Sequence, residues 1–230
     1  MSSDKFGTNW LTLEHGKAAY RADFLVYGIT ISILAVFLAI TAPSDAWQKI
    51  LVLVLLGLAG WTFVEYVLHR FVLHGLQPFK RWHLEHHRRP AALICTPTIL
   101  SSSLIALLVF LPSLLLSDLW SASALTLGLL IGYMGYAVVH HAIHHWHGKN
   151  AWLKQLKRWH GMHHHSSEFV GYGVTSAFWD HALGTAHAKP RCLNLGIRSL
   201  TSKRRKSSIP SIVALSGKAR IMATEKSELE

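Results

Sequence analysis

The chain has 230 residues, of which 50% are hydrophobic and only 15% are charged, and a formal net charge of +11 at pH 7. This composition argues against a soluble globular domain. Two cysteines are too few for a disulfide framework and indicate ordinary residues in a reducing compartment. Basic residues at a membrane surface and in the C-terminal tail account for the net charge, so we expect no nucleic-acid partner.

Residues 1–23 form a polar N-terminal segment, and no small-residue cleavage site closely follows the first apolar run after it. That run is therefore predicted to be a retained span and not a signal peptide. Four apolar runs are each long enough to cross a hydrocarbon core of about 30 Å as a helix. They are residues 24–42, 50–68, 91–116 and 119–139. The predicted fold is an all-α integral membrane protein with four transmembrane helices.

Basic residues predict the orientation of these spans. The segment 43–49 contains one lysine and the turn at 117–118 contains no basic residue. The loop after the second run contains Arg70, Lys80, Arg81, Arg88 and Arg89. The positive-inside rule therefore places the N-terminus, the 69–90 loop and the C-terminal region in the cytoplasm. The host membrane would be a bacterial inner membrane or the endoplasmic reticulum.

The composition of the chain changes after residue 187. Residues 188–230 are basic and serine-rich, and they show no clear periodicity. We predict a mobile basic tail there. The membrane-embedded domain is accordingly predicted to be residues 24–187.

Ten of the 17 histidines fall into four clusters, each next to an apolar run. Neutral imidazole is the commonest side-chain metal ligand, and one ion needs about four to six ligands. Ten grouped donors therefore favour two metal ions at a membrane surface. The clustered residues are His69, His74, His83, His86, His87, His140, His144, His160, His163 and His164.

The spacing of the clusters suits helices, because residues three and four apart share a helix face. The HxxHH motifs at 83–87 and 160–164 each predict three imidazoles on one stripe, and the pair at 140–144 can hold one ion from one side. These motifs are expected to form a cytoplasmic helical cap that carries the two-metal site. His141, His145 and His165 adjoin the clusters and could replace members in a shifted register.

His69 and His74 do not fit this spacing. Five residues on a regular helix rotate the second ring by about 140° from the first. Either the helix breaks where it leaves the membrane, or the two rings serve different metals.

Few carboxylates accompany the histidines. Between His69 and His187 the acidic residues are Glu85, Asp118, Glu168 and Asp180. A soluble di-iron carboxylate bundle or a zinc finger is therefore not expected.

The remaining candidates would orient the imidazole N–H groups or line the pocket. They are Glu65, Glu85, Asp180 and His181. Glu65 is favoured, because a carboxylate inside a span costs about 2.5–3.5 kcal/mol on insertion scales and so tends to mark a partner or a site. No catalytic residue beyond the metal ligands is predicted.

The order of the four histidine motifs resembles that of the fatty acid hydroxylase and sterol desaturase superfamily. The segments LKRWHGMHHH at 156–165 and GYGVTSAFWD at 171–180, followed by Gly184 and Thr185, are similar to the sphingolipid fatty acid 2-hydroxylases in particular. The resemblance covers about residues 60–187.

This resemblance implies a non-haem di-iron oxygenase in which the ten clustered histidines hold two iron ions. Zinc can occupy such positions in purified samples. The enzyme would use O₂ to hydroxylate a long-chain lipid from the bilayer at the 2-position of its fatty acyl chain. The sequence contains no fused cytochrome b5 domain, so electrons are expected from a separate cytochrome b5-like or ferredoxin-like protein.

Three alternatives remain open. Residues 69–89 also resemble carotenoid hydroxylases, so a carotenoid or sterol hydroxylase or desaturase would share the same metals. The extra HxxxH pair argues against an acyl-CoA desaturase. A metal transporter is a remote alternative, because its ligands should lie at mid-membrane and these lie at the ends of spans.

Overall fold

The computed structural model describes Glu14 and residues 16–94, 96–148, 150–165 and 170–186. In these segments the chain is helical, and the only β interaction is an isolated bridge between Glu14 and Ile94. The predicted tail at 188–230 lies outside the described residues. The helices are α1 (Lys17–Thr41), η1 (Ser44–Ala46), α2 (Trp47–Val67), η2 (Leu68–Leu73), α3 (Phe79–Arg88), α4 (Thr98–Ile105), η3 (Ala106–Phe110), α5 (Leu111–Leu116), α6 (Leu119–His145), α7 (Ala151–His165) and α8 (Phe178–Ala182).

Four stretches of helix are long and apolar enough to span a membrane, which confirms the predicted number. They are α1, Ser44–Leu73, Thr98–Leu116 and α6. Their ends differ from the apolar runs, because a helix ends where its backbone hydrogen bonds end and not where the apolar sequence ends. Helix α1 begins at Lys17 and α6 continues to His145. The third span begins at Thr98 and not at 91, because Pro97 disfavours helix in the residue before it.

The outer faces of the spans are apolar. On α1, Ile33 is 62% exposed and Ile40 is 78% exposed, and on α5, Leu116 is 88% exposed. Water would make such exposure unfavourable, whereas lipid chains are as apolar as these side chains. The exposed residues therefore form the lipid-facing surface.

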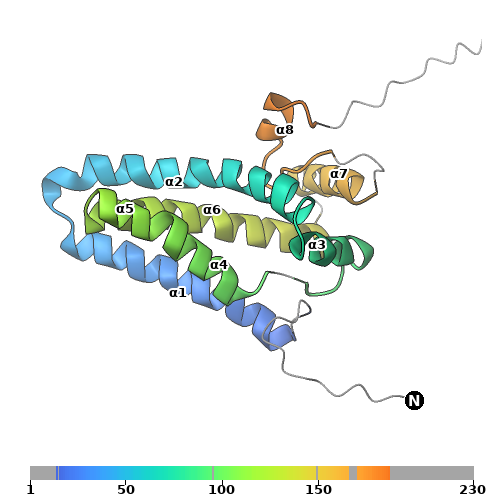
Figure 1. Ribbon diagram of the computed structural model, residues 1–230, viewed down its shortest axis with the longest axis horizontal. Coiled ribbons are helices and arrows are strands. Elements are labelled where there is room, and N and C mark those ends of the chain that lie inside the picture. Colours follow the sequence, from blue (N-terminus) through green and yellow to red (C-terminus); the bar gives the residue numbers. More distant parts are fainter. Residues whose placement is uncertain (1–13, 15, 95, 149, 166–169, 187–230) are drawn as a thin grey trace, which may run out of the picture. The chain divides into compact units, whose positions relative to one another are not determined.

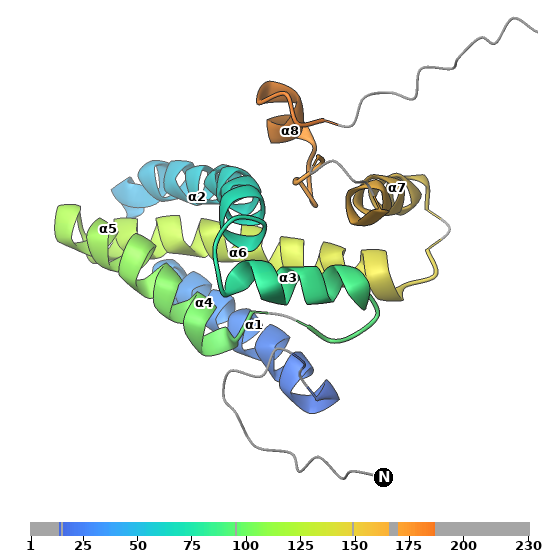
Figure 2. The same ribbon diagram turned by 45° about the vertical axis from the view of Figure 1, so that its right-hand side comes forward.

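Helices α2 and α6 run side by side along the bundle (Figures 1 and 2). Gly57 of α2 and Gly128 of α6 allow their backbones to touch. A Cβ atom on Gly57 would lie 2.2 Å from the carbonyl oxygen of Leu125, and one on Gly128 would lie 2.0 Å from that of Val54. Small residues at such crossings are typical of membrane helix packing. This crossing fixes the position of α6, which carries His140 and His144, relative to the second span, which continues into η2 and carries His69.

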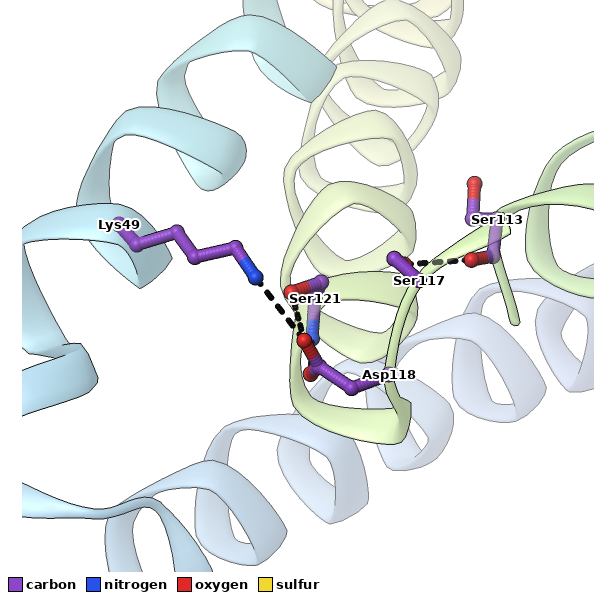
Figure 3. Close-up of polar contacts among 5 residues, drawn as sticks. All are labelled: Lys49, Ser113, Ser117, Asp118 and Ser121. Atoms are coloured by element: carbon purple, nitrogen blue, oxygen red, sulfur yellow. Dashed lines mark hydrogen bonds and ion pairs between the residues drawn. The ribbon is translucent and has the colours of Figure 1, made fainter. Parts of the chain in front are cut away.

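Asp118 connects α2 and α6 at the end of the bundle that is distant from the histidines. Its carboxylate accepts hydrogen bonds from the backbone and hydroxyl of Ser121, each 2.8 Å long, and pairs with the Lys49 ammonium at 2.9 Å (Figure 3). Lys49 and then the Ser121 contacts lower the pKa of Asp118 to about 2. Asp118 therefore caps α6 and links it to the start of α2.

The opposite end carries the shorter elements. The chain continues from α2 through η2 to α3, and from α6 to α7, so these helices gather at one end of the bundle (Figure 1). They form the helical cap that the sequence predicts. Its placement on the cytoplasmic side remains a prediction.

Candidate metal centre

The structure brings nine of the ten clustered histidines into two neighbouring groups. Within each group the candidate ligand nitrogens lie within 4.8 Å of one another. The five-histidine group consists of His69, His74, His83, His87 and His163. The four-histidine group consists of His86, His140, His144 and His160.

The spacing between nitrogens is typical of ligands around one ion. The Nε2 atom of His83 lies 2.9 Å from that of His69 and 3.0 Å from that of His87. Two ligands at right angles, with metal–nitrogen bonds of about 2.1 Å, are about 3.0 Å apart. The tenth histidine, His164, lies beside the four-histidine group, with its Nε2 atom 2.9 Å from that of His160.

A π-helix explains the irregular spacing of His69 and His74. Residues Leu68–Leu73 form η2, and the backbone N–H of His74 donates to the carbonyl of His69 at 3.2 Å. A bond between residues five apart widens the turn and brings both residues to one side of the helix. Their rings lie 5.2 Å apart, in the same group. The regular α-helix therefore ends at Val67, in line with the first alternative, whereas the second alternative is not supported, because both rings lie in the same group.

Each HxxHH motif contributes to both groups. On α3, His83 and His87 join the five-histidine group and His86 joins the other. On α7, His163 joins the five-histidine group and His160 the other. Residues on one stripe still differ in direction and in height along the helix, so a motif placed between two groups supplies both. Each HxxHH motif is thus divided between the two groups, whereas His69 and His74 lie in the same group.

Backbone carbonyls orient two imidazoles of the five-histidine group. The Nδ1–H of His69 donates to the carbonyl of Tyr172 at 2.5 Å, and the Nδ1–H of His163 donates to that of Val170 at 3.0 Å. A carbonyl can only accept, so the proton must be on Nδ1 in both rings. Their Nε2 atoms therefore carry the lone pair that a metal needs.

The four-histidine group contains polar atoms without protein partners. Within the described residues, both ring nitrogens of His86 and the Nδ1 atom of His160 are buried and make no hydrogen bond. Buried polar atoms are rarely left unpaired. A metal ion would satisfy the Nε2 atom of His86. Nitrogen ligands of this kind suit iron, zinc and related transition metals, so the two groups can hold metal ions.

Glu65 is buried, but it does not hydrogen-bond to an imidazole as predicted. Its Oε1 atom accepts the backbone N–H groups of Val174 at 2.6 Å and Thr175 at 2.9 Å. Its Oε2 atom accepts the Thr175 hydroxyl at 2.5 Å. Glu65 therefore holds the loop that follows α7.

Asp180 holds the same loop from α8. Its two carboxylate oxygens accept the backbone N–H groups of Tyr172 and Gly173, each at 2.8 Å. The Thr185 hydroxyl donates to Asp180 at 2.9 Å. The prediction that Asp180 orients an imidazole directly is thus replaced by an effect through the loop backbone.

Glu85 and His181 lie away from the imidazoles. The Glu85 carboxylate forms ion pairs with Arg89 at 2.6 Å and Arg88 at 3.6 Å, which lower its pKa. His181 is exposed on α8. The structure therefore contradicts the predicted contacts of Glu85 and His181 with the centre, because both side chains face outward.

A cavity of about 120 Å³ adjoins both histidine groups. Helices α1, α3 and α6 contribute most of its lining, which includes Tyr20, Asp23, Phe24, Phe79, Trp82, His83, His86, Tyr133, Tyr136 and His140. Asp23 is 7% exposed and accepts a hydrogen bond from the Thr98 hydroxyl at 2.5 Å. In the sequence, Asp23 belongs to the polar N-terminal segment, because it precedes the first apolar run. In the structure α1 begins at Lys17, so Asp23 lies inside the first span.

Burial, followed by neighbouring cationic or imidazole groups, lowers the pKa of several clustered histidines outside the spans. The pKa is about 4 for His74, about 3 for His86 and His164, and about 2 for His87. These imidazoles are neutral at pH 7. Neutral imidazole is the form that binds a metal.

The metal-free protein should therefore lose stability in acid. The unfolded chain binds protons on these histidines near pH 6.5, whereas the folded chain binds them only near the lowered values, so the unfolded state gains protons first as the pH falls. We expect the thermal midpoint of chelated protein in detergent to be steady from pH 8 to 7 and to fall by roughly 5 °C or more between pH 6.5 and 4.5. A midpoint that is constant down to pH 4.5 would contradict this.

Comparisons with known proteins agree with this geometry. The fatty acid hydroxylase family model matches residues 54–185, which include all ten clustered histidines. The dihydroceramide fatty acyl 2-hydroxylase FAH2 of Arabidopsis thaliana is 33% identical over 68% of this chain and 70% of its own length. The ceramide very long chain fatty acid hydroxylase scs7 of Schizosaccharomyces pombe is 33% identical over 57% of this chain and 41% of its own length.

A solved structure shares the fold. Full-length scs7p, in which only the hydroxylase domain is visible, is 24% identical with a TM-score of 0.57, over 74% of this chain and 67% of that one. Because the family match covers more than half of the chain and includes every histidine motif, the chain belongs to the fatty acid hydroxylase family and is an oxidoreductase.

Proposed function

We propose that the protein is a membrane di-iron oxygenase that hydroxylates the 2-position of a fatty acyl chain in a long-chain lipid. The observation that carries this proposal is the pair of adjacent all-histidine groups beside a largely aromatic cavity. The names of the Arabidopsis relatives, dihydroceramide fatty acyl 2-hydroxylases, support an acyl chain and its 2-position.

Iron is the metal that the proposed reaction needs. Two iron ions held by the ten clustered histidines would supply the redox chemistry that activates O₂ for insertion into an unactivated C–H bond. Zinc accepts the same ligands but has no redox chemistry, so a zinc-loaded sample would be inactive.

The chain's own residues would bind the substrate and exclude water. Tyr133 and Tyr136 of α6 line the cavity and pack against Trp61, with ring centroids 5.2 Å and 5.8 Å from it. Such a lining suits an acyl chain, and its continuation to His86 and His140 would bring a carbon atom of that chain to the metals. Asp23 provides a hydrogen-bond acceptor in the same cavity for the polar end of the lipid.

The charge of the cap supports a proposal for the side of the membrane and for the electron source. The excess of Lys and Arg near the cap supports a cytoplasmic centre under the positive-inside rule. Lys154 and Arg158 are exposed on α7, the helix that carries three of the clustered histidines. This face would suit the acidic surface of a separate electron donor.

Lipid analysis of cells that express the chain tests this function. We expect mass spectrometry to find acyl chains that have gained one oxygen atom at the 2-position, and we expect the His83→Ala variant to lose that product. His147→Ala is a matched control, because His147 is exposed and belongs to neither group. Oxygen on a ring or a polyene, or a new double bond, would instead indicate a sterol or carotenoid enzyme or a desaturase.

A further inference from the structure

The two histidine groups differ in how their imidazoles are supported. In the five-histidine group, His69 and His163 donate their Nδ1–H protons to backbone carbonyls. In the four-histidine group, the Nδ1 atoms of His86 and His160 have no such acceptor within the described residues. Hydrogen bonds to the far ring nitrogen fix a ligand's orientation and increase its basicity. The two groups should therefore bind metal with different strength.

Both supporting carbonyls belong to one short segment, the loop 170–175. Gly171 lies between Val170 and Tyr172, the two residues whose carbonyls accept hydrogen bonds from the imidazoles. It has a φ of 74°, a left-handed conformation that glycine adopts readily. The backbone of Gly173 passes so close to Ser176 that a Cβ atom would lie 2.0 Å from the Ser176 carbonyl oxygen. A loop of this shape needs outside contacts to hold its carbonyls in place.

Two buried carboxylates supply those contacts from opposite directions. Glu65, 4% exposed on α2, accepts three hydrogen bonds from Val174 and Thr175, and Asp180, 1% exposed on α8, accepts the N–H groups of Tyr172 and Gly173. Together they engage the backbone N–H of four consecutive residues. Hydrogen bonds to an ionised acceptor are about twice as strong as neutral ones.

Asp180 is also connected to the second span, through hydrogen bonds of Thr185 and Tyr66. The Thr185 hydroxyl lies 2.9 Å from Asp180 and 3.0 Å from the hydroxyl of Tyr66, which accepts a hydrogen bond from Arg70 at 2.6 Å. Tyr66 is fully buried. Both carboxylates therefore connect the loop to α2, which continues directly into η2 and His69.

We propose that Glu65 and Asp180 are positioning residues for one metal only. By fixing the loop 170–175 they hold His69 and His163 ready to bind, so the five-histidine group binds its metal more tightly than the four-histidine group. This inference rests on the proposed two-metal function. It concerns the difference between the two sites, which that function does not require.

Zinc binding by the purified full-length chain in detergent tests the proposal, because it needs no turnover. One histidine variant isolates each site: His160→Ala disables the four-histidine group and His74→Ala the five-histidine group. Affinity is measured by competition with a chelator, and bound zinc is counted by mass spectrometry. We expect the site that remains in His160→Ala to be tighter than the site that remains in His74→Ala.

Adding Glu65→Gln to each background then tests the positioning role. A glutamine keeps the size of the side chain, but its NH₂ group cannot accept the hydrogen bonds that the second oxygen receives. We expect zinc affinity to fall about 10–100-fold in the His160→Ala background and to stay within about threefold in the His74→Ala background. Glu85→Gln is the matched control, because the Glu85 carboxylate pairs with Arg88 and Arg89 at the surface, and it should change neither affinity.

Asp180→Asn should reproduce the selective loss from the other side of the loop. If Glu65→Gln does not fold, Thr175→Val removes one of the three bonds and should give a smaller loss at the same site. Equal affinities at the two wild-type sites, or an equal loss at both, would overturn the inference and leave the proposed function standing. A wild-type chain that binds no metal would overturn both.

Discussion

Replacing His163 by alanine should abolish lipid hydroxylation and leave about one metal ion per chain. His163 is 3% exposed, its Nε2 atom lies 3.1 Å from that of His74, and its Nδ1–H donates to the carbonyl of Val170. Alanine removes a metal-binding nitrogen and leaves that carbonyl without its partner. Loss of an outer hydrogen-bond partner alone typically costs 10–100-fold, so loss of the ligand itself should lower turnover by more than about 100-fold. Product formation and metal content per purified chain measure the two effects.

His165→Ala is the matched control for this variant. His165 lies two residues further along α7, is exposed and belongs to neither histidine group. We expect turnover and metal content to match those of the wild-type chain. If His163→Ala kept turnover within about threefold of wild type, the five-histidine group would have no part in the reaction.

Replacing Gly128 by leucine should prevent α2 and α6 from packing. The first added carbon atom would lie 2.0 Å from the Val54 carbonyl oxygen, and this backbone atom cannot move without moving the helix. Overpacking usually costs about 1–3 kcal/mol, and a clash between two backbones exceeds the ordinary case. We expect a fall in thermal midpoint of about 10 °C or more, or no folded protein. Metal content should fall with it, because α6 carries His140 and His144, and α2 continues into η2, which carries His69.

Gly135→Leu provides the control on the same helix. Gly135 is exposed two turns further along α6, and a Cβ atom there would meet no atom within 4 Å. The same side chain should therefore be tolerated against lipid, with a thermal midpoint within about 2 °C of wild type. Equal damage from both variants would show that leucine is harmful on α6 in general, and that the crossing at Gly128 is not special.

The sequence by itself determined the number of spans and the residues of the candidate centre. Uncharged runs such as 24–42 and 119–139 have to be helices in lipid, because no water is available to satisfy their backbone groups. The HxxHH and HxxxH spacings depend only on the helical repeat, so they predicted shared faces on α3, α6 and α7. The apolar runs and the histidine spacings each depend on residues that are close in the sequence, so they can be predicted without the tertiary structure.

The partners of each side chain were decided only by the tertiary structure. The sequence around His69 and His74 left open whether the helix breaks or the rings serve different metals, and only the structure shows a π-helical turn with both residues in one group. The sequence singled out Glu65 but could not show that it binds a loop about 110 residues later. From the sequence, Asp23 was predicted to be a polar residue before the first span, whereas in the structure it lines a cavity together with His86. Each of these contacts joins residues far apart in the chain, and their distances are set by how α1, α2 and α6 pack.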